Sequence, residues 1–227
     1  MALRAWEEEN GVIVWRVTDD EAPKSNVYCE DCFCSPDGRY FLYERRNPAK
    51  GIREMVRCEF GSWRQDVVAE GATAPLISPS GVAYFFRDAG PGAMEMMRLD
   101  IGGGRAESMG FAWPSYSVRK TLGRGTISCD ERYFAQGVVE SFDPQMFAID
   151  LLDLQDGSIS RIFRDPFISN PHAQFEPSEG RQILVQHNRG SQFAPDGRGI
   201  EPFDERGISL ILVDAPSGKM EPLAVGP

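Results

Sequence analysis

Both histidines of this 227-residue chain lie in one short stretch, and imidazole is the side chain best suited to move protons near neutral pH. His172 and His187 flank two short apolar segments, which are joined by a turn near Pro177 and Gly180. The aliphatic and β-branched residues after the turn predict a strand, so the unit should be an antiparallel hairpin. We therefore expect both histidines at the end of the hairpin that lies away from the turn.

The register of this hairpin decides whether the two imidazoles meet. If the reversal is centred on Glu179 and Gly180, His172 lies directly opposite His187, with Cβ atoms roughly 4.5–5.5 Å apart. A change of one residue in loop length instead places Gln186 opposite His172 and turns His187 to the other face. The sequence allows both registers. It also allows each histidine to be an ordinary strand-end residue.

The histidine hairpin is the fourth copy of a strand–turn–strand pattern. The same slot before each turn is held by Ser35, Ser78, Ser128 and Glu176, so successive copies are 43, 50 and 48 residues apart. Periods of roughly 40–50 residues with several strands each are typical of propeller blades. A sandwich of two packed sheets also explains short strands, but it does not require a Ser-Pro-Asp-Gly type of turn at a fixed period.

Between the hairpins there is room for two further strands in each repeat. The sequence therefore predicts an all-β fold, an incomplete β-propeller of about four four-stranded antiparallel blades, within a single domain over residues 1–227. We place a leading strand at 11–18 and the blades at roughly 28–70, 71–112, 120–166 and 170–225. Unless the ring closes at this number of blades, a sheet edge stays unpaired, so self-association through an open blade edge is one expectation.

Strand order in a propeller brings several cations to the mouth that the histidine hairpin reaches. The innermost strand of each blade begins, and the next strand ends, at the same face, where the connecting loops form a funnel. The cations expected at this mouth are Arg45, Arg46, Arg87, Arg119, Lys120, Arg124 and Arg189. Guanidinium groups bind carboxylates through paired hydrogen bonds, so an acidic sugar or another small polyanion fits such a site.

The fourth repeat also carries a long connection at residues 188–207, rich in glycine and charged residues. Long loops at a functional rim are often lids. A simple surface insertion explains this segment equally well.

Composition limits the remaining classes of function. The net charge of −10 argues against nucleic acid as a general partner, and the chain lacks a long apolar stretch, so we expect no membrane partner and a cytoplasmic location. Five cysteines suit a reducing compartment. Cys29, Cys32 and Cys34 form a C-x-x-C-x-C run, but no second Cys/His cluster completes four ligands. These residues alone therefore predict no metal site.

The histidine stretch resembles the oligogalacturonate lyase family, and the Ser-Pro-Asp-Gly hairpins are similar to those of TolB-type propellers. The resemblance rests on His172-x-Gln174-Phe175-x-Pro177 and on Gln186-His187-Asn188-Arg189-Gly190. It implies a manganese-dependent lyase of pectin degradation, built on a seven-bladed propeller, that cleaves short oligogalacturonates by β-elimination. The metal-binding segments of that family would be expected in later blades than this chain contains.

Removing the C5 proton of a uronate requires a base with a pKa near the working pH and positive charge at the adjacent carboxylate. The resemblance implies that His172 is this base, and His187 a neighbour that positions it. The substrate-binding residues that we predict are His187, Arg189, Arg124, Arg87, Arg45 and Gln174. The alternative is a non-catalytic propeller that binds acidic sugars or a protein partner.

Overall fold

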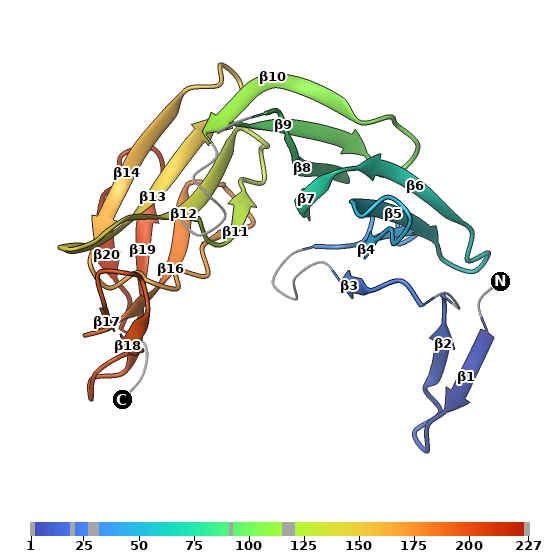
Figure 1. Ribbon diagram of the computed structural model, residues 1–227, viewed down its shortest axis with the longest axis horizontal. Coiled ribbons are helices and arrows are strands. Elements are labelled where there is room, and N and C mark those ends of the chain that lie inside the picture. Colours follow the sequence, from blue (N-terminus) through green and yellow to red (C-terminus); the bar gives the residue numbers. More distant parts are fainter. Residues whose placement is uncertain (1–2, 19–20, 27–31, 91–92, 115–120, 225–227) are drawn as a thin grey trace. The chain divides into compact units, whose positions relative to one another are not determined.

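The computed structural model describes residues 3–18, 21–26, 32–90, 93–114 and 121–224. These residues form β-strands joined by turns, and no helix occurs among them (Figure 1). Accordingly, no helix within these ranges is long and apolar enough to cross a membrane. The prediction of an all-β fold is confirmed.

The strands form four antiparallel sheets of four strands each, which we call the first to fourth blades. The chain divides into two compact units by its internal contacts. Unit 1 comprises Met1–Asp88 and Met96–Met109, and unit 2 comprises Ala89–Glu95 and Gly110–Pro227. The first blade and most of the second belong to unit 1, and the third and fourth blades belong to unit 2.

A hairpin precedes the first blade in unit 1. It consists of β1 (Leu3–Glu7) and β2 (Ile13–Arg16), which pair antiparallel. The leading strand expected at 11–18 is therefore the second arm of this hairpin. The first arm was not predicted, because the glutamates from Glu7 to Glu9 interrupt its apolar pattern.

The first and second blades have their strands in sequence order across each sheet. The first blade contains β3 (Lys24–Asn26), β4 (Tyr40–Arg46), β5 (Arg53–Glu59) and β6 (Gln65–Glu70). The second contains β7 (Ala72–Ile77), β8 (Val82–Asp88), β9 (Ala93–Asp100) and β10 (Glu107–Pro114). Leu42 and Met55 of the first blade share one buried cluster with Phe85 and Leu99 of the second. Each such side chain contributes about 1.5–3 kcal/mol by leaving water.

Unit 2 contains the third and fourth blades. The third consists of β11 (Thr121–Ile127), β12 (Tyr133–Phe142), β13 (Gln145–Asp153) and β14 (Ile159–Asp165). The fourth consists of β15 (Gln174–Phe175), β16 (Gln182–Asn188), β19 (Ile208–Asp214) and β20 (Met220–Pro222). Between β16 and β19 the chain forms a separate small hairpin of β17 (Gln192–Phe193) and β18 (Gly199–Glu201).

The strand β13 shows why these sequences form blades. Its residues Phe147, Ile149 and Leu151 belong to the buried cluster shared with the fourth blade. The alternate residues Ala148 and Leu152 are also buried. Successive side chains of a strand point to opposite faces, so β13 is covered on both faces, and an almost continuous apolar run is the sequence that such a strand requires.

The turn slot found in the sequence has the same role in every blade. Ser35 and Ser128 each accept the backbone N–H five residues later, at Tyr40 and Tyr133, over 2.9 Å. Each hydroxyl also donates to the aspartate two residues later, over 2.6 Å. Ser78 similarly accepts the N–H of Val82. The repeated sequence pattern is thus a series of turns, each of which is closed by the side chain in its slot.

Candidate functional site

The histidine hairpin has the register that separates the two imidazoles. Gln174 pairs with Leu184 and Phe175 with Ile183, and the Gln186 N–H donates to the Pro171 carbonyl over 2.6 Å. This register aligns His172 with Gln186. The expectation that His172 lies directly opposite His187 is therefore wrong, and the other register is confirmed.

Glu176 explains this register. Its backbone N–H donates to the Gln182 carbonyl over 2.9 Å, which closes a loop centred on Glu179. Its carboxylate accepts the N–H groups of Ser178, Glu179 and Arg181 over 2.7, 2.7 and 3.1 Å. The Ser178 hydroxyl also donates to it over 2.6 Å, and this bond, followed by those from the backbone N–H groups, lowers the pKa of Glu176 to about 2. Glu176 thus closes a five-residue loop, and this odd number of residues gives the observed register.

His187 is oriented by the third blade. Its Nε2 lies 3.2 Å from Asp165 Oδ1, at the end of β14, and its ring meets the Phe167 ring edge-on at 5.8 Å. On the other side of its strand it pairs with Ser209 of β19. Asp165 and Phe167 were not singled out in the sequence. The signal available there is that they end the strand that precedes the histidine hairpin.

His172 is held in an uncommon backbone conformation. Its φ is 41°, in the left-handed region that non-glycine residues rarely adopt. Its Nε2 lies 2.9 Å from the Asn170 amide nitrogen, which can only donate, so Nε2 carries the lone pair. Residues in such conformations persist only where surrounding contacts impose them, and they gather at functional sites.

The contacts that impose this conformation come from the segment before His172. Pro171 is buried, and a Cβ on Gly137 of β12 would lie 2.6 Å from its Cγ. The Pro171 carbonyl is also the acceptor of Gln186. Pro171 is therefore fixed between the third blade and β16, and it fixes the start of the following residue.

Arg124 lies on β11, a strand that contacts the histidine hairpin. The Phe175 N–H of β15 donates to Thr126 Oγ1 of β11 over 3.0 Å, so these two strands lie side by side. Arg124 is two residues before Thr126, and His172 is three residues before Phe175. Both side chains are partly exposed. Gln174, which lies on β15, is also partly exposed.

Arg189 has a structural task. Its Nε and Nη2 donate to the carbonyls of Gly207 and Ile208, each over 3.3 Å, and the Asp204 N–H donates back to the Arg189 carbonyl over 2.7 Å. These bonds join the two ends of the connection between β16 and β19.

That connection is also fixed to the third blade. Gln145 donates to the Ser191 carbonyl over 2.9 Å and accepts the Phe193 N–H over 3.0 Å. The Phe193 ring packs against Phe142 and Phe147, each at 5.6 Å between centroids. The segment that was interpreted as a lid or an insertion is thus held by polar and aromatic contacts.

The two other predicted arginines belong to unit 1. Arg45 of β4 donates from Nε to Glu54 Oε2 over 2.6 Å, and the Glu54 side chain is only 3% exposed. Hydrogen bonds from Asn47 and Arg45 lower the pKa of Glu54 against the opposing effect of burial. Arg87 is exposed on β8, paired with Ala72.

The predicted site residues thus divide between the units. Unit 2 contains Arg124, His172, Gln174, His187 and Arg189, whereas unit 1 contains Arg45 and Arg87. Arg46 is exposed at the end of β4. Arg119 and Lys120 lie outside the described residues.

Solved structures of known proteins share this architecture. An oligogalacturonate lyase in complex with manganese superposes with a TM-score of 0.72 at 14% identity, over 100% of this chain and 60% of its own. The oligogalacturonate lyase of Vibrio parahaemolyticus superposes with a TM-score of 0.69 at 12% identity, over 98% of this chain and 58% of its own. TolB of Acinetobacter baumannii superposes with a TM-score of 0.55 at 15% identity, over 96% of this chain and 47% of its own. The chain has a TolB-like β-propeller fold.

The likeness extends over part of those proteins and is one of structure. The chain spans about 60% of the length of the two lyases. No family model matches the sequence. A search of curated proteins likewise finds no match.

The side chains that the structure describes do not fit a manganese site. Within the described ranges, no group of three or more His, Cys, Asp and Glu residues is placed to hold a metal ion. His187 is bound to Asp165, and the Nε2 of His172 faces an amide. Cys32 is exposed and Cys34 partly buried, and Cys29 lies outside the described residues.

Proposed function

We propose that this chain binds short acidic oligosaccharides of the oligogalacturonate type, and that His172 is the base of a β-elimination at a uronate. The observation that carries the proposal is the constrained His172, whose Nε2 lone pair is defined by Asn170 and whose backbone is fixed by Pro171. The structural likeness to two oligogalacturonate lyases supports the same class of substrate.

In this reaction the bound sugar displaces the Asn170 amide from the Nε2 of His172, and Nε2 then takes the proton from C5 of the uronate. The electron pair of the C5–H bond forms the double bond between C4 and C5, and the C4–O bond to the neighbouring sugar breaks. The departing oxygen takes a proton from water. A positioned base contributes roughly 10²–10⁴-fold to such a step. No step is assigned to manganese, because the side chains present do not form its site.

Arg124 supplies positive charge for the same step. Negative charge develops on the uronate carboxylate as C5 loses its proton, and a cation held beside it stabilises the enolate. Arg124 lies on β11, the strand whose Thr126 accepts the Phe175 N–H of the histidine hairpin. A guanidinium there would bind the carboxylate through two hydrogen bonds.

The test is the ultraviolet absorbance of the unsaturated product from di- and trigalacturonate, measured with and without added manganese. We expect His172→Ala to lose at least about 100-fold in kcat with a small change in KM. Arg124→Gln should lower kcat/KM, and Arg124→Lys should recover part of it. Arg181→Ala is the matched control, because it removes an exposed arginine at the opposite end of the same hairpin. Equal rates for wild type and His172→Ala would remove this histidine from the mechanism.

The second candidate is a propeller that binds acidic sugars or a protein partner without catalysis. It is favoured because two arginines that were predicted to bind ligand make contacts within the protein. Arg45 forms an ion pair with Glu54, and Arg189 donates to the carbonyls of Gly207 and Ile208. Calorimetry that detects trigalacturonate binding with no product would support this function for sugars. Sedimentation measured over a range of protein concentrations tests self-association through a blade edge, where β20 is the outermost strand of the fourth blade.

A further inference from the structure

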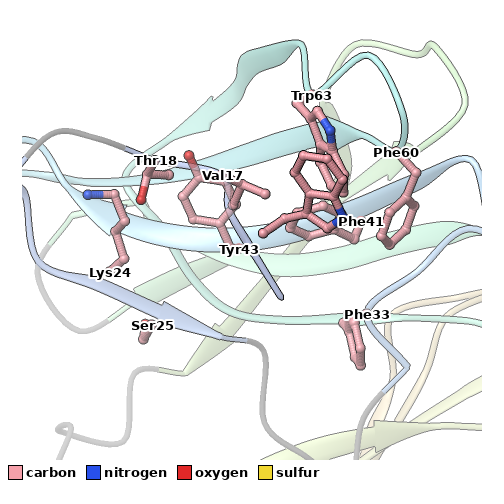
Figure 2. Close-up of a pocket in the computed structure, with 10 residues that line it drawn as sticks. Val17, Thr18, Lys24, Ser25, Phe33, Phe41, Tyr43, Phe60 and Trp63 are labelled. Carbon is pink, nitrogen blue, oxygen red and sulfur yellow. The ribbon is translucent and has the colours of Figure 1, made fainter. Parts of the chain in front are cut away.

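Unit 1 contains a pocket that no predicted site residue lines. It is formed by the first blade, by β2 and by the segment that follows β2, and its cavity measures about 440 Å³ (Figure 2). Pockets for small ligands typically measure roughly 300–1,000 Å³. The pocket is therefore large enough for a small ring system, and its walls indicate which kind.

Aromatic side chains form a continuous ring group along one wall of the pocket. Ring centroids are 5.8 Å apart for Trp15 and Trp63, 6.0 Å for Trp63 and Phe60, and 4.9 Å for Phe60 and Phe41. Figure 2 shows Phe41, Phe60 and Trp63 together, and it shows Phe33, which also lines the pocket, apart from them. Trp15 is 43% exposed and Phe60 41%. The ring group thus keeps open surface for a ligand although its members already contact one another.

Trp63 occupies a position that is glycine in the three other blades. In each blade the third strand ends on an acidic residue, and the carbonyl of this residue accepts the N–H of the residue four positions later. The donor–acceptor pairs are Trp63–Glu59, Gly104–Asp100, Gly157–Asp153 and Gly218–Asp214, over 2.8, 3.0, 2.8 and 2.7 Å. The first blade therefore departs from the repeat at this turn.

A tryptophan at this position is conformationally unfavourable. The φ of Trp63 is 58°, in the left-handed region, as are the values of 76° for Gly157 and 72° for Gly218. Glycine adopts this region without strain, whereas a bulky residue there is an outlier. Residues in such conformations persist only where surrounding contacts impose them, and they gather at ligand sites. The indole of Trp63 is thus retained here against the preference of its backbone.

The glycines of the third and fourth blades also allow close packing against a neighbouring strand. A Cβ on Gly157 would overlap the Phe111 ring of β10, and a Cβ on Gly218 would overlap the Ile162 carbonyl of β14. At the first blade the indole of Trp63 blocks an approach of this kind. A strand cannot come as close to this turn, which favours a small ligand over a further strand as the occupant of the pocket.

Charge does not direct recognition in this pocket. Lys24 lines it, but its ammonium donates to the Ala22 carbonyl over 2.8 Å, and the residue takes part in a further interaction within the protein. None of the described residues that line the pocket carries a carboxylate. The ring group is therefore the main recognition element.

The pocket is held in place by hydrogen bonds beside the ring group. The Tyr43 hydroxyl donates to Gln65 Oε1 over 2.7 Å, and Gln65 Nε2 donates to the Val17 carbonyl. These two bonds attach the segment after β2 to β4 and β6 of the first blade. The walls are therefore ordered before a ligand arrives, which reduces the entropic cost of binding.

We infer that this pocket binds a small uncharged aromatic molecule, whose flat ring system packs against Trp15, Phe60 and Trp63. Aromatic rings gain from offset-stacked or edge-to-face contacts with one another, which a saturated ring does not reproduce. Sugar hydroxyls need more hydrogen-bonding partners than this apolar lining offers. The inference goes beyond the proposed function, because it concerns a different ligand class and residues of unit 1.

Isothermal titration calorimetry with probes of similar size tests the class of ligand. The probes are 2-naphthamide, which is flat and neutral, its saturated decahydro analogue, and 2-naphthoate, which is flat and anionic. We expect the wild type to bind naphthamide about three- to tenfold more tightly than the saturated analogue, as ring contacts provide beyond the buried area. Naphthoate should bind no more tightly than naphthamide. Equal affinity for the flat and saturated amides, or a preference for naphthoate, would overturn the inference.

Trp63→Gly tests the site itself, because it introduces the residue that the other blades have at this position and relieves the backbone. It should weaken naphthamide at least about tenfold while the far-ultraviolet circular dichroism stays unchanged. Trp15→Ala is a second variant and should act in the same direction. Trp6→Ala is the matched control, since it removes an indole of the same hairpin that is 56% exposed and does not line the pocket, and it should leave the affinity unchanged.

Three results with these variants would contradict the inference. They are undiminished binding by both Trp63→Gly and Trp15→Ala, an equal loss in Trp6→Ala, and no binding by the wild type at millimolar naphthamide. Sedimentation tests a second copy of the chain as the alternative occupant. A dimer that Trp63→Gly dissociates, in a protein that binds none of the probes, would assign this surface to self-association and overturn the inference.

Discussion

The buried serine of the third blade offers a strong test of the repeat, because replacing it by alanine removes two hydrogen bonds and little volume. Ser128 is 0% exposed. Its Oγ accepts the Tyr133 N–H over 2.9 Å and donates to Asp130 Oδ1 over 2.6 Å. The Ser128→Ala variant therefore deprives a buried backbone donor of this acceptor and separates the turn from its aspartate.

The two losses have different sizes. Depriving a buried donor of its acceptor costs about 1–3 kcal/mol. The carboxylate of Asp130 is exposed and regains water, so losing that bond costs a net of about 0.5–1.5 kcal/mol. We expect Ser128→Ala to lower the free energy of unfolding by about 2–4 kcal/mol. With an m value of about 2 kcal/mol per M, the midpoint in urea falls by about 1–2 M.

Urea unfolding followed by circular dichroism measures this shift, and an unchanged m value shows that the unfolding transition is the same. Ser62→Ala is the matched control, since the exposed Ser62 hydroxyl donates to the partly exposed carboxylate of Glu59 over 2.7 Å. It should change stability by less than about 0.5 kcal/mol. The double variant with Asp130→Asn isolates the energy of the Ser128–Asp130 bond. A loss below about 0.5 kcal/mol for Ser128→Ala would refute the view that the slot closes the turn.

Three further predictions concern other positions. Glu176→Ala should lower the thermal midpoint, and Glu176→Ser should lower it less. The pKa of Glu176 falls to about 2 on folding, so the stabilisation from its carboxylate is complete above about pH 4.3 and is lost as the pH falls toward 2. In a pH series, the difference in thermal midpoint between wild type and Glu176→Ala should therefore disappear near pH 2, and a constant difference would contradict this. Gly125→Ala should cost about 3 kcal/mol in urea unfolding, since its Cβ would lie 2.0 Å from Phe134 Cζ, while Gly103→Ala, where the new Cβ meets nothing, should be neutral. Arg161→Leu should cost about 3 kcal/mol, because it takes the guanidinium from the buried Asp150 carboxylate at 2.8 Å, and adding Asp150→Leu should restore much of the loss; a double variant no more stable than the single one would count against this.

The fold was predictable because its signals are local and repeated. Each blade is indicated in the sequence by a slot residue, a turn and two apolar runs. The hydroxyls of Ser35, Ser78 and Ser128 each accept a backbone N–H from the far side of their turn. The register of the fourth hairpin was less accessible, because it depends on whether the loop holds an odd or even number of residues. That number is fixed by the hydrogen bond from the Glu176 N–H to the Gln182 carbonyl, which strand patterns do not encode.

The candidate site was predictable only in its residue types. His172 and Arg124 were singled out, and the hydrogen bond between β15 and β11 brings their strands together. The partner of His187 was missed, because Asp165 approaches it from another blade. The aromatic pocket was missed for the same reason: Trp15 and Trp63 are far apart in the sequence, and scattered aromatic residues give no periodic signal. Contacts of this kind depend on packing between elements.

The bonds that Arg189 makes across the base of the connection between β16 and β19 have a consequence for variation. Because the two ends of this segment are joined, its hairpin of β17 and β18 takes no part in the pairing of the four-stranded sheet. Doubling the length of such a closed loop costs only about 0.6 kcal/mol in chain entropy. Evolution, or a protein engineer, can therefore lengthen the turn between β17 and β18 while the strands of the fourth blade stay in register.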